Sequence, residues 1–189
     1  MDQAVATTGS VLPYRGVWPT LGANVFLAPS CYVIGQVTIA DDANLWFNVV
    51  VRGDDNWIRI GARTNVQDGT IIHVFQDLFP TSIGADVTIG HSAGLHGCTI
   101  EDRAMVGIGA IVLDGAVVEQ DAIVAAGAVV SPGKRVKRGE MWAGCPAKLV
   151  REVKPEEREF MKVNVPNYCD LAGEYLALRR AYGAPGAGR

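Results

Sequence analysis

The sequence has no apolar run approaching the roughly 20 residues that a membrane-spanning helix requires, so we expect no membrane contact. A strongly basic stretch is also missing, because 17 Lys and Arg residues are balanced by 20 Asp and Glu residues. Nucleic acid is therefore not an expected partner, since phosphate binding depends on clustered cations. The first ten residues lack the charged and apolar regions of a secretion signal, which predicts a cytoplasmic protein.

Paired cysteines are absent as well. The four cysteines lie far apart with no CxxC spacing: Cys31, Cys98, Cys145 and Cys169. This excludes a disulfide framework and a cysteine zinc site, and predicts buried or free thiols.

What the sequence does contain is an aliphatic residue at every sixth position. The run extends from Leu21 to Val136, with three extra residues before Ile60, five extra before Ile83, and one residue fewer before Ile100. Small residues are frequent just after the aliphatic position: Gly35, Ala40, Gly61, Gly84, Gly90 and Gly107. A period of six is typical of neither a helix nor an alternating strand, and small residues suit tight corners.

This pattern resembles the hexapeptide-repeat family, in which each hexad forms one strand and corner and three hexads make a triangular coil. The resemblance implies an all-β fold, a left-handed parallel β-helix with its aliphatic side chains stacked inside. Left-handed winding is an exception to the usual right-handed crossover and does not follow from the hexads themselves. We assign residues 1–150 to this β-helix and its N-terminal lead-in.

A different pattern follows the repeats. Residues 151–182 form a predicted helical segment packed outside the β-helix, and residues 183–189 a flexible tail. Pro155 and the acids after it open a helix, which Pro166 should interrupt. A second helix, Tyr168 to Tyr182, would then have one apolar face: Leu171, Tyr175, Leu176 and Leu178.

The chain has only three histidines, and the hexads place them. With three hexads per coil, His73 and His96 stack on successive coils, roughly 4.8 Å apart, and can share one ion. His91 belongs to a different face and meets them only if a second copy packs against the first. A closed three-fold ring would build three such sites. Three imidazoles with one open position is the arrangement of a catalytic zinc site.

The same hexad phase predicts the positions of three polar residues. Arg52 shares the column of the stacked histidines, whereas Gln67 and Asp68 lie on the face of His91. Arg52 of one subunit would therefore face Asp68 of the next, and Gln67 could hydrogen-bond a metal-bound water. In the alternative interpretation, Asp68 is a corner residue chosen for its turn conformation.

Three segments are similar to gamma-class carbonic anhydrases: Val51–Asp54, Thr64–Gly69 and Ile89–Cys98. The five-residue spacing of His91 and His96 also matches that family. The resemblance implies that the three histidines bind zinc, with iron or cobalt possible, across the interface of a homotrimer. It implies hydration of carbon dioxide to bicarbonate by a metal-bound hydroxide.

The resemblance also implies roles for neighbouring residues. The family's intersubunit ion-pair set corresponds to Arg52, Asp54 and Asp68, and Gln67 corresponds to the residue that orients the metal-bound water. Asp55 corresponds to an acid that passes protons to solvent, and Tyr168 is another candidate for that path. Alternatively, Asp54 and Asp55 only cap their loop. The family's second acidic loop is absent, since residues 74–80 contain one acid, so the resemblance does not extend to fast proton removal.

Other functions stay open. Residues 125–130 and 143–148 resemble the last coils of coenzyme A-dependent acyltransferases, although relatives of gamma carbonic anhydrase share them. A metal-dependent thioesterase of the same superfamily would use the same nucleophile, and a non-catalytic trimeric scaffold would need no open metal position. Whether Cys98 senses oxidation is open as well.

Overall fold

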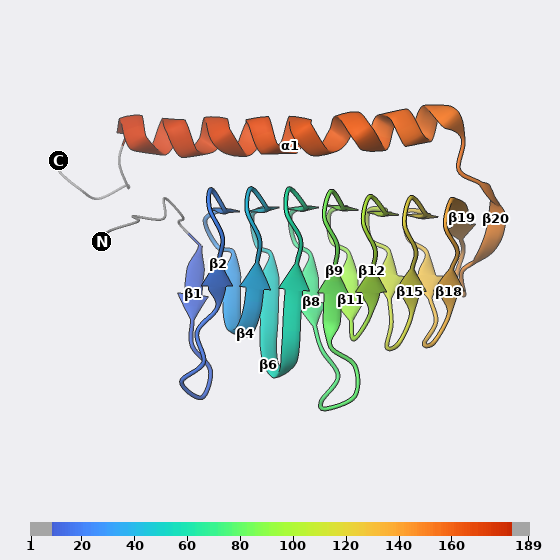
Figure 1. Cartoon of the computed structure of the whole chain (residues 1–189), viewed down its shortest axis with the longest axis horizontal. Coiled ribbons are helices and arrows are strands. Elements are labelled where there is room, and N and C mark those ends of the chain that lie inside the picture. Colours follow the sequence, from blue (N-terminus) through green and yellow to red (C-terminus); the bar gives the residue numbers. More distant parts are fainter. Residues whose placement is uncertain (1–8, 183–189) are drawn as a thin grey trace.

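The computed structural model describes residues 9–182, and the predicted flexible tail lies outside that range. The chain winds into a triangular β-helix with one long helix along its side (Figure 1). We number the three faces of the prism 1, 2 and 3, and name each corner by the two faces that it joins.

Short strands form the faces. Face 1 consists of β3 (Phe26–Leu27), β5 (Asn44–Leu45), β7 (Asn65–Val66), β10 (Thr88–Ile89), β13 (Met105–Val106), β16 (Ile123–Val124) and β19 (Glu140–Ala143). Face 2 consists of β1 (Ser10–Leu12), β8 (Ile71–His73), β11 (Gly94–His96), β14 (Ile111–Val112), β17 (Val129–Val130) and the first halves of β4 (Tyr32–Ile39) and β6 (Val50–Ile60). Face 3 consists of β2 (Thr20–Leu21), β9 (Thr81–Ile83), β12 (Thr99–Ile100), β15 (Val117–Val118), β18 (Arg135–Val136) and the second halves of β4 and β6.

The sixth-position aliphatic residues stack in three columns, because each of these strands pairs in parallel with the strand one coil further on. Leu95, for example, pairs with Ile72 in the preceding coil and with Val112 in the next. All the predicted positions belong to one core. Each of them is fully buried except Leu21, in the first coil, which is partly buried. A fully buried aliphatic side chain contributes about 1.5–3 kcal/mol. The left-handed parallel β-helix that the resemblance to the hexapeptide-repeat family implies is confirmed.

Both large interruptions of the repeat lie at the 2–3 corner. The three extra residues extend β6 across it, and the five extra residues form the loop at 74–80, one coil later. Asn56 Nδ2 donates a hydrogen bond to the carbonyl of Phe75 (3.3 Å) and links the two insertions. The two long insertions of the repeat therefore meet at this corner.

The 3–1 corner carries residues of alternating charge. Successive coils place there Asp42, Arg63, Asp86, Arg103, Asp121 and Arg138, which we call the charge ladder. Arg63 donates two hydrogen bonds to Asp86 (2.6 and 2.7 Å), and Arg103 donates two to Asp121 (2.8 and 3.3 Å). The four residues of these pairs have φ near +60°, which is uncommon for residues other than glycine.

Small residues after the aliphatic position give clearance between coils. A Cβ on Gly61 would lie 2.4 Å from the carbonyl carbon of Gly84, and one on Gly107 would lie 2.5 Å from the nitrogen of Ala126. Neither glycine has a positive φ, so the close approach of the next coil's backbone explains them.

The C-terminal segment corrects one prediction. β20 (Lys148–Glu152) pairs antiparallel with β19 and leads into a single helix, α1 (Pro155–Tyr182), which continues through Pro166. Proline removes one backbone hydrogen bond, at a cost of about 3 kcal/mol in a helix interior. Val165 and Ala172, on either side of it, are buried against the β-helix, and this packing offsets the loss.

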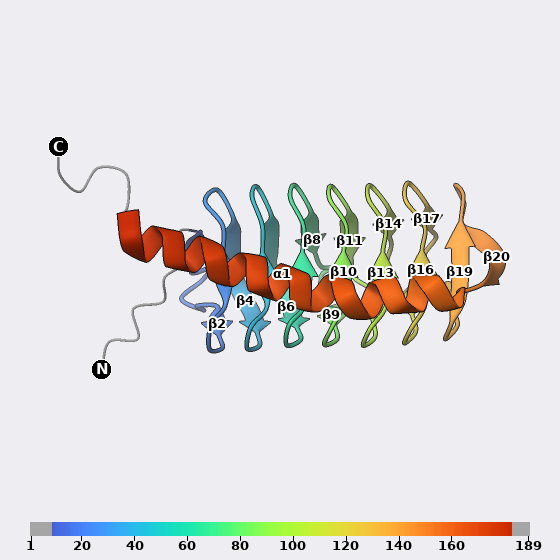
Figure 2. The ribbon, with the colours of Figure 1, turned by 90° about the horizontal axis from the view of Figure 1, so that it is seen from above.

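α1 lies lengthwise over face 1, between two columns of corners (Figure 2). Its inward residues are Met161, Val165, Tyr168, Ala172 and Leu176. The predicted apolar face was wrong for Leu171 and Leu178, which are exposed, because the inward stripe continues from the first half of the helix. Within residues 9–182, no helix combines the length and apolarity needed to cross a membrane.

Candidate metal centre

The stacked pair of histidines is present as predicted. β8 and β11 pair so that His73 and His96 are direct neighbours in adjacent coils, at the 2–3 corner. His73 Nδ1 and His96 Nε2 lie 3.2 Å apart. Two nitrogens bound to one tetrahedral zinc ion, each about 2.0–2.1 Å from it, would be separated by about 3.3 Å. The two imidazoles therefore already have the spacing that a shared ion requires.

A carboxylate holds the other nitrogen of each ring. His73 Nε2 donates to Asp54 Oδ1 (2.9 Å), and His96 Nδ1 donates to Asp114 Oδ1 (2.5 Å). Such carboxylate–histidine pairs fix the tautomer and orientation of metal-binding imidazoles. Burial alone would raise the pKa of Asp54, but hydrogen bonds from His73 and Arg52 outweigh it and hold that pKa below its ordinary value.

His91 has the same arrangement at a different corner. It follows β10 at the 1–2 corner, and its Nδ1 lies 3.0 Å from Asp68 Oδ2. Its Nε2 has no partner among the described residues. The described residues of one chain bring Asp54, Asp55 and His73 together as possible ligands, within 4.8 Å of one another, but His91 is not among them. One chain therefore supplies two imidazoles to one corner and the third to another.

Asp114 is a site residue that the sequence analysis missed. It follows Val112 by two positions, so the hexad phase places it at the 2–3 corner, one coil beyond His96. That phase was a usable signal. An aspartate at a corner is, however, ordinarily a turn residue, so its position alone does not mark it as part of a site.

Arg52 and Asp55 surround the histidine pair. Arg52 is exposed and pairs with Asp54 of its own chain. Asp55 is also exposed, and its backbone N–H donates to Asp54 Oδ1 (3.1 Å). The predicted contact of Arg52 with Asp68 of another subunit stays a prediction.

Gln67 belongs to a buried polar chain beneath α1. Its side chain donates to Asn65 Oδ1 (3.1 Å), and Asn65 donates to Thr88 Oγ1 (2.9 Å), which also accepts from Asn164 of α1 (3.0 Å). These bonds fix the Gln67 amide and leave its carbonyl oxygen without a partner in the described range. A fixed, free acceptor is what orienting a water requires.

Tyr168 lies on the same side of α1 as the 1–2 corner. Its ring packs edge-on against Trp46, with centroids 5.4 Å apart. Burial, and then the negative charge of Asp68, raise the pKa of its hydroxyl. Tyr168 is therefore near the carboxylate that holds His91.

The loop at 74–80 gives the centre an apolar wall. Phe75 packs against Phe79, with centroids 6.1 Å apart, and against the ring of His96, at 6.4 Å. Leu78, at the tip of the loop, is 67% exposed. Aromatic rings therefore dominate the segment 74–80, in which the sequence analysis found a single acid.

Cys98 is two residues from His96 but does not face solvent. Its side chain is 1% exposed, and burial raises its pKa to about 12. Reactive thiols are accessible and have a low pKa, so this environment disfavours oxidation sensing.

The coil repeat defines a hexapeptide-repeat β-helix protein, and the histidine pair gives it a candidate metal centre. A family model described as "Hexapeptide repeat of succinyl-transferase" matches residues 80–107 and 97–132. A solved structure of a Bacillus cereus protein assigned as an acetyltransferase superimposes with a TM-score of 0.88 and 34% identity, covering 90% of this chain and 99% of that one.

Relatives of known sequence show which group of hexapeptide-repeat proteins the chain resembles. Protein YrdA of Escherichia coli is 48% identical over 87% of this chain and 92% of its own length. The carbonic anhydrase of Geobacillus kaustophilus is 37% identical, covering 90% of this chain and 93% of that protein. Gamma carbonic anhydrase 2 of Arabidopsis thaliana is 46% identical over 82% of this chain, which spans 57% of that longer protein. The chain belongs to the gamma-class carbonic anhydrase family.

Proposed function

We propose that this protein catalyses the reversible hydration of carbon dioxide to bicarbonate at a divalent-metal site shared between the subunits of a homotrimer. The main support for this proposal is the pair His73 and His96, whose facing nitrogens are 3.2 Å apart. Each of the three histidines also has a carboxylate on one nitrogen, which leaves the other for an ion. Carbonic anhydrases among the relatives support the substrate.

The donor set fits zinc, the default ion for imidazole ligands, and also fits iron or cobalt. His73 and His96 of one chain and His91 of the next would hold the ion. When bound, such an ion lowers the pKa of water to about 7 and supplies a nucleophile at neutral pH.

A trimer would bring the third histidine to the pair. Face 2 lies between the 1–2 corner with His91 and the 2–3 corner with the pair. Its outward side has exposed apolar residues, including Tyr32, Ile71 and Ile111. A ring that buries this face joins unlike corners of neighbouring subunits, and Arg52 would then meet Asp68 across the interface.

The chain's own residues would orient the water, contact the carbon dioxide and transfer the proton. The Gln67 carbonyl accepts a hydrogen bond from the attacking water, and Phe75 and Phe79 offer carbon dioxide an apolar surface. Asp55, exposed beside His73, passes the proton to solvent, with Tyr168 as a second path. A cytoplasmic location remains a prediction from the sequence.

Stopped-flow hydration of carbon dioxide, on anaerobically purified protein of known metal content, tests the activity. We expect hydration that requires stoichiometric metal and is lost in His91→Ala. Metal-loaded protein with no hydration would contradict the proposed activity.

Mixed trimers test the shared site. His91→Ala and the double variant His73→Ala/His96→Ala should each be inactive. Co-expression of the two should restore about one quarter of the sites, because an intact site needs one chain of each kind in the right order. No recovery, with mixed trimers demonstrated, would contradict a site shared between chains.

A coenzyme A-dependent acyltransferase is the second candidate, supported by the Bacillus cereus structure. In the proposed metal site all three histidines bind the ion, so none of them would remain as the catalytic base that an acyltransferase needs. Acetyl-CoA turnover that survives a chelator would favour this function, and chelator-sensitive hydrolysis of an acyl thioester would favour a metal-dependent thioesterase.

A further inference from the structure

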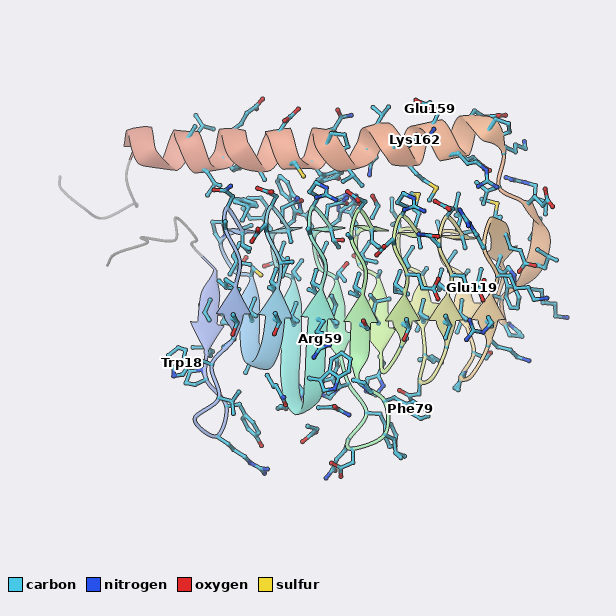
Figure 3. All side chains as sticks on the ribbon, viewed as in Figure 1. Trp18, Arg59, Phe79, Glu119, Glu159 and Lys162 are labelled. Atoms are coloured by element: carbon cyan, nitrogen blue, oxygen red, sulfur yellow. The ribbon has the colours of Figure 1, made fainter. Side chains whose placement is uncertain are left out.

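A groove runs between α1 and the charge ladder, away from the histidines. Its larger part has a volume of about 640 Å³, and a second part of about 430 Å³ continues it along the helix. Arg63 and Cys169 line both parts. In Figure 3, Lys162 on α1 and Phe79 beside the histidine pair lie on opposite sides of the β-helix. The 3–1 corner is also the one corner without a histidine, so it would face outward in the proposed trimer.

The larger part of the groove has an excess of positive charge. Its lining includes five cations and three carboxylates, and the whole protein has a net charge of −3. The cations are Arg63, Arg103, Arg138, Arg158 and Lys162; the carboxylates are Asp86, Asp121 and Asp170. The groove is therefore a local basic site on an acidic protein.

Arg158 differs from the other four cations of this lining, each of which has a carboxylate partner; Lys162, for example, pairs with Glu159 (3.3 Å). Arg63, Arg103 and Arg138 all donate to ladder carboxylates, whereas the guanidinium of Arg158 has no acceptor among the described residues. It lies against the bare backbone of Gly139, where an added Cβ would be 2.9 Å from Nη2. A planar guanidinium held at the edge of a groove is suited to bind an oxyanion with two parallel hydrogen bonds.

An apolar floor lies beside these cations. Met161 and Val165 are 9% and 5% exposed and line the groove, and Met161 packs against Ile123 and Val153. Small-molecule sites commonly combine such a floor with a few polar groups that fix orientation.

We propose that this groove binds a small anionic molecule with an apolar body. Its phosphate or carboxylate accepts hydrogen bonds from Arg158 and Arg138, and its body lies on Met161 and Val165. The site is separate from the metal centre and independent of the proposed catalytic activity.

Methyl NMR of protein labelled at the methionine methyl groups tests the proposal, because the Met161 methyl lies in the groove and Met161→Leu assigns its signal. The probes are benzyl phosphate and phenylacetate, which distinguish phosphate from carboxylate, and benzyl alcohol, which is neutral. We expect at least one anion to shift the Met161 signal saturably, and benzyl alcohol to leave it unchanged.

Arg158→Gln should weaken anion binding at least about tenfold, as expected for loss of charge-assisted hydrogen bonds. Arg59→Gln is the matched control, since Arg59 is exposed on face 3 and stacks on Trp57 outside the groove. If Arg158→Gln fails to fold, Lys162→Gln replaces it, because that side chain is 69% exposed. Three results would overturn the proposal: no saturable shift with either anion, equal binding of benzyl alcohol, or equal weakening in the control.

Discussion

At the scale of single residues, each histidine of the candidate metal centre is held by an aspartate from a neighbouring coil. Asp54 and Asp68 come from the coil before their histidines, and Asp114 from the coil after His96. A carboxylate on one ring nitrogen makes the other nitrogen a better ligand and keeps the ring from rotating. In the proposed metal site, the three aspartates would therefore prepare the rings to bind the ion.

Asp114→Asn tests this preparation. An amide at this position can present its NH2 group to His96 Nδ1 and favour the tautomer with a proton on Nε2, which opposes metal binding. We expect metal affinity to fall about 10- to 100-fold, measured by competition with a chelator. Asp77→Asn, in the exposed loop nearby, should leave the affinity unchanged. An equal loss in both variants would assign the effect to overall charge.

At the scale of elements, the sequence predicted the strands well and the helix less well. The hexads predicted the three columns because a repeated local pattern fixes both the coil and its register. Pro166 was predicted to end a helix, since propensity argues that locally, whereas packing on face 1 decides the outcome. The hexad phase predicted the positions of the site residues that lie within the repeat, such as His73 and His96. It did not predict the aromatic wall, because residues 74–80 are an insertion outside the repeat.

Two glycine substitutions of the same kind should have opposite effects. Gly61→Ala places a Cβ 2.4 Å from the backbone of Gly84 and should lower the free energy of unfolding by about 1–3 kcal/mol. Gly173→Ala, in α1, meets no atom within 4 Å and should raise it by about 0.5–1 kcal/mol. Urea unfolding measures both values. The same sign for the two variants would contradict close coil contact as the reason for Gly61.

The start of α1 should respond to acid. Glu157 accepts two hydrogen bonds from Arg151 (2.7 Å each) and one from the backbone N–H of Lys154 (2.9 Å), which lower its pKa from 4.5 to about 2. Because the pKa is lower in the folded state, the stabilisation is complete above about pH 4.5 and is lost as the pH falls towards 2. The protection of the first turns of α1 against hydrogen exchange, relative to the intrinsic rate at each pH, should fall in that window. Glu157→Gln should abolish this pH dependence, whereas Glu156→Gln should preserve it.

At the scale of the whole molecule, two separate regions flank the prism. The pair His73 and His96 lies at the 2–3 corner, opposite face 1, and the basic groove lies at the 3–1 corner beside α1. Figures 1 and 2 show α1 lengthwise over face 1. A sequence of one chain can indicate that His91 is separate from the pair, but it does not determine how copies meet. The proposed trimer is therefore argued from the exposed apolar side of face 2.

Ile71→Arg tests the trimer. Ile71 is 57% exposed on face 2, so the substitution should be tolerated by a single chain but should place charges in the proposed interface. We expect sedimentation velocity to show dissociation, with loss of bound metal. Leu149→Arg, 54% exposed on β20 at the end of the prism, should remain trimeric. A trimeric, metal-loaded Ile71→Arg protein would contradict face 2 as the interface.

The alternating charges at the 3–1 corner have a consequence for folding. In a β-helix of nearly interchangeable coils, a segment could pair with the wrong neighbour by slipping along the axis. A slip of one coil would put arginine over arginine and aspartate over aspartate, while only a slip of two would restore opposite charges. The charge ladder thus makes a slip of one coil electrostatically unfavourable, and it does so without using any residue of the core.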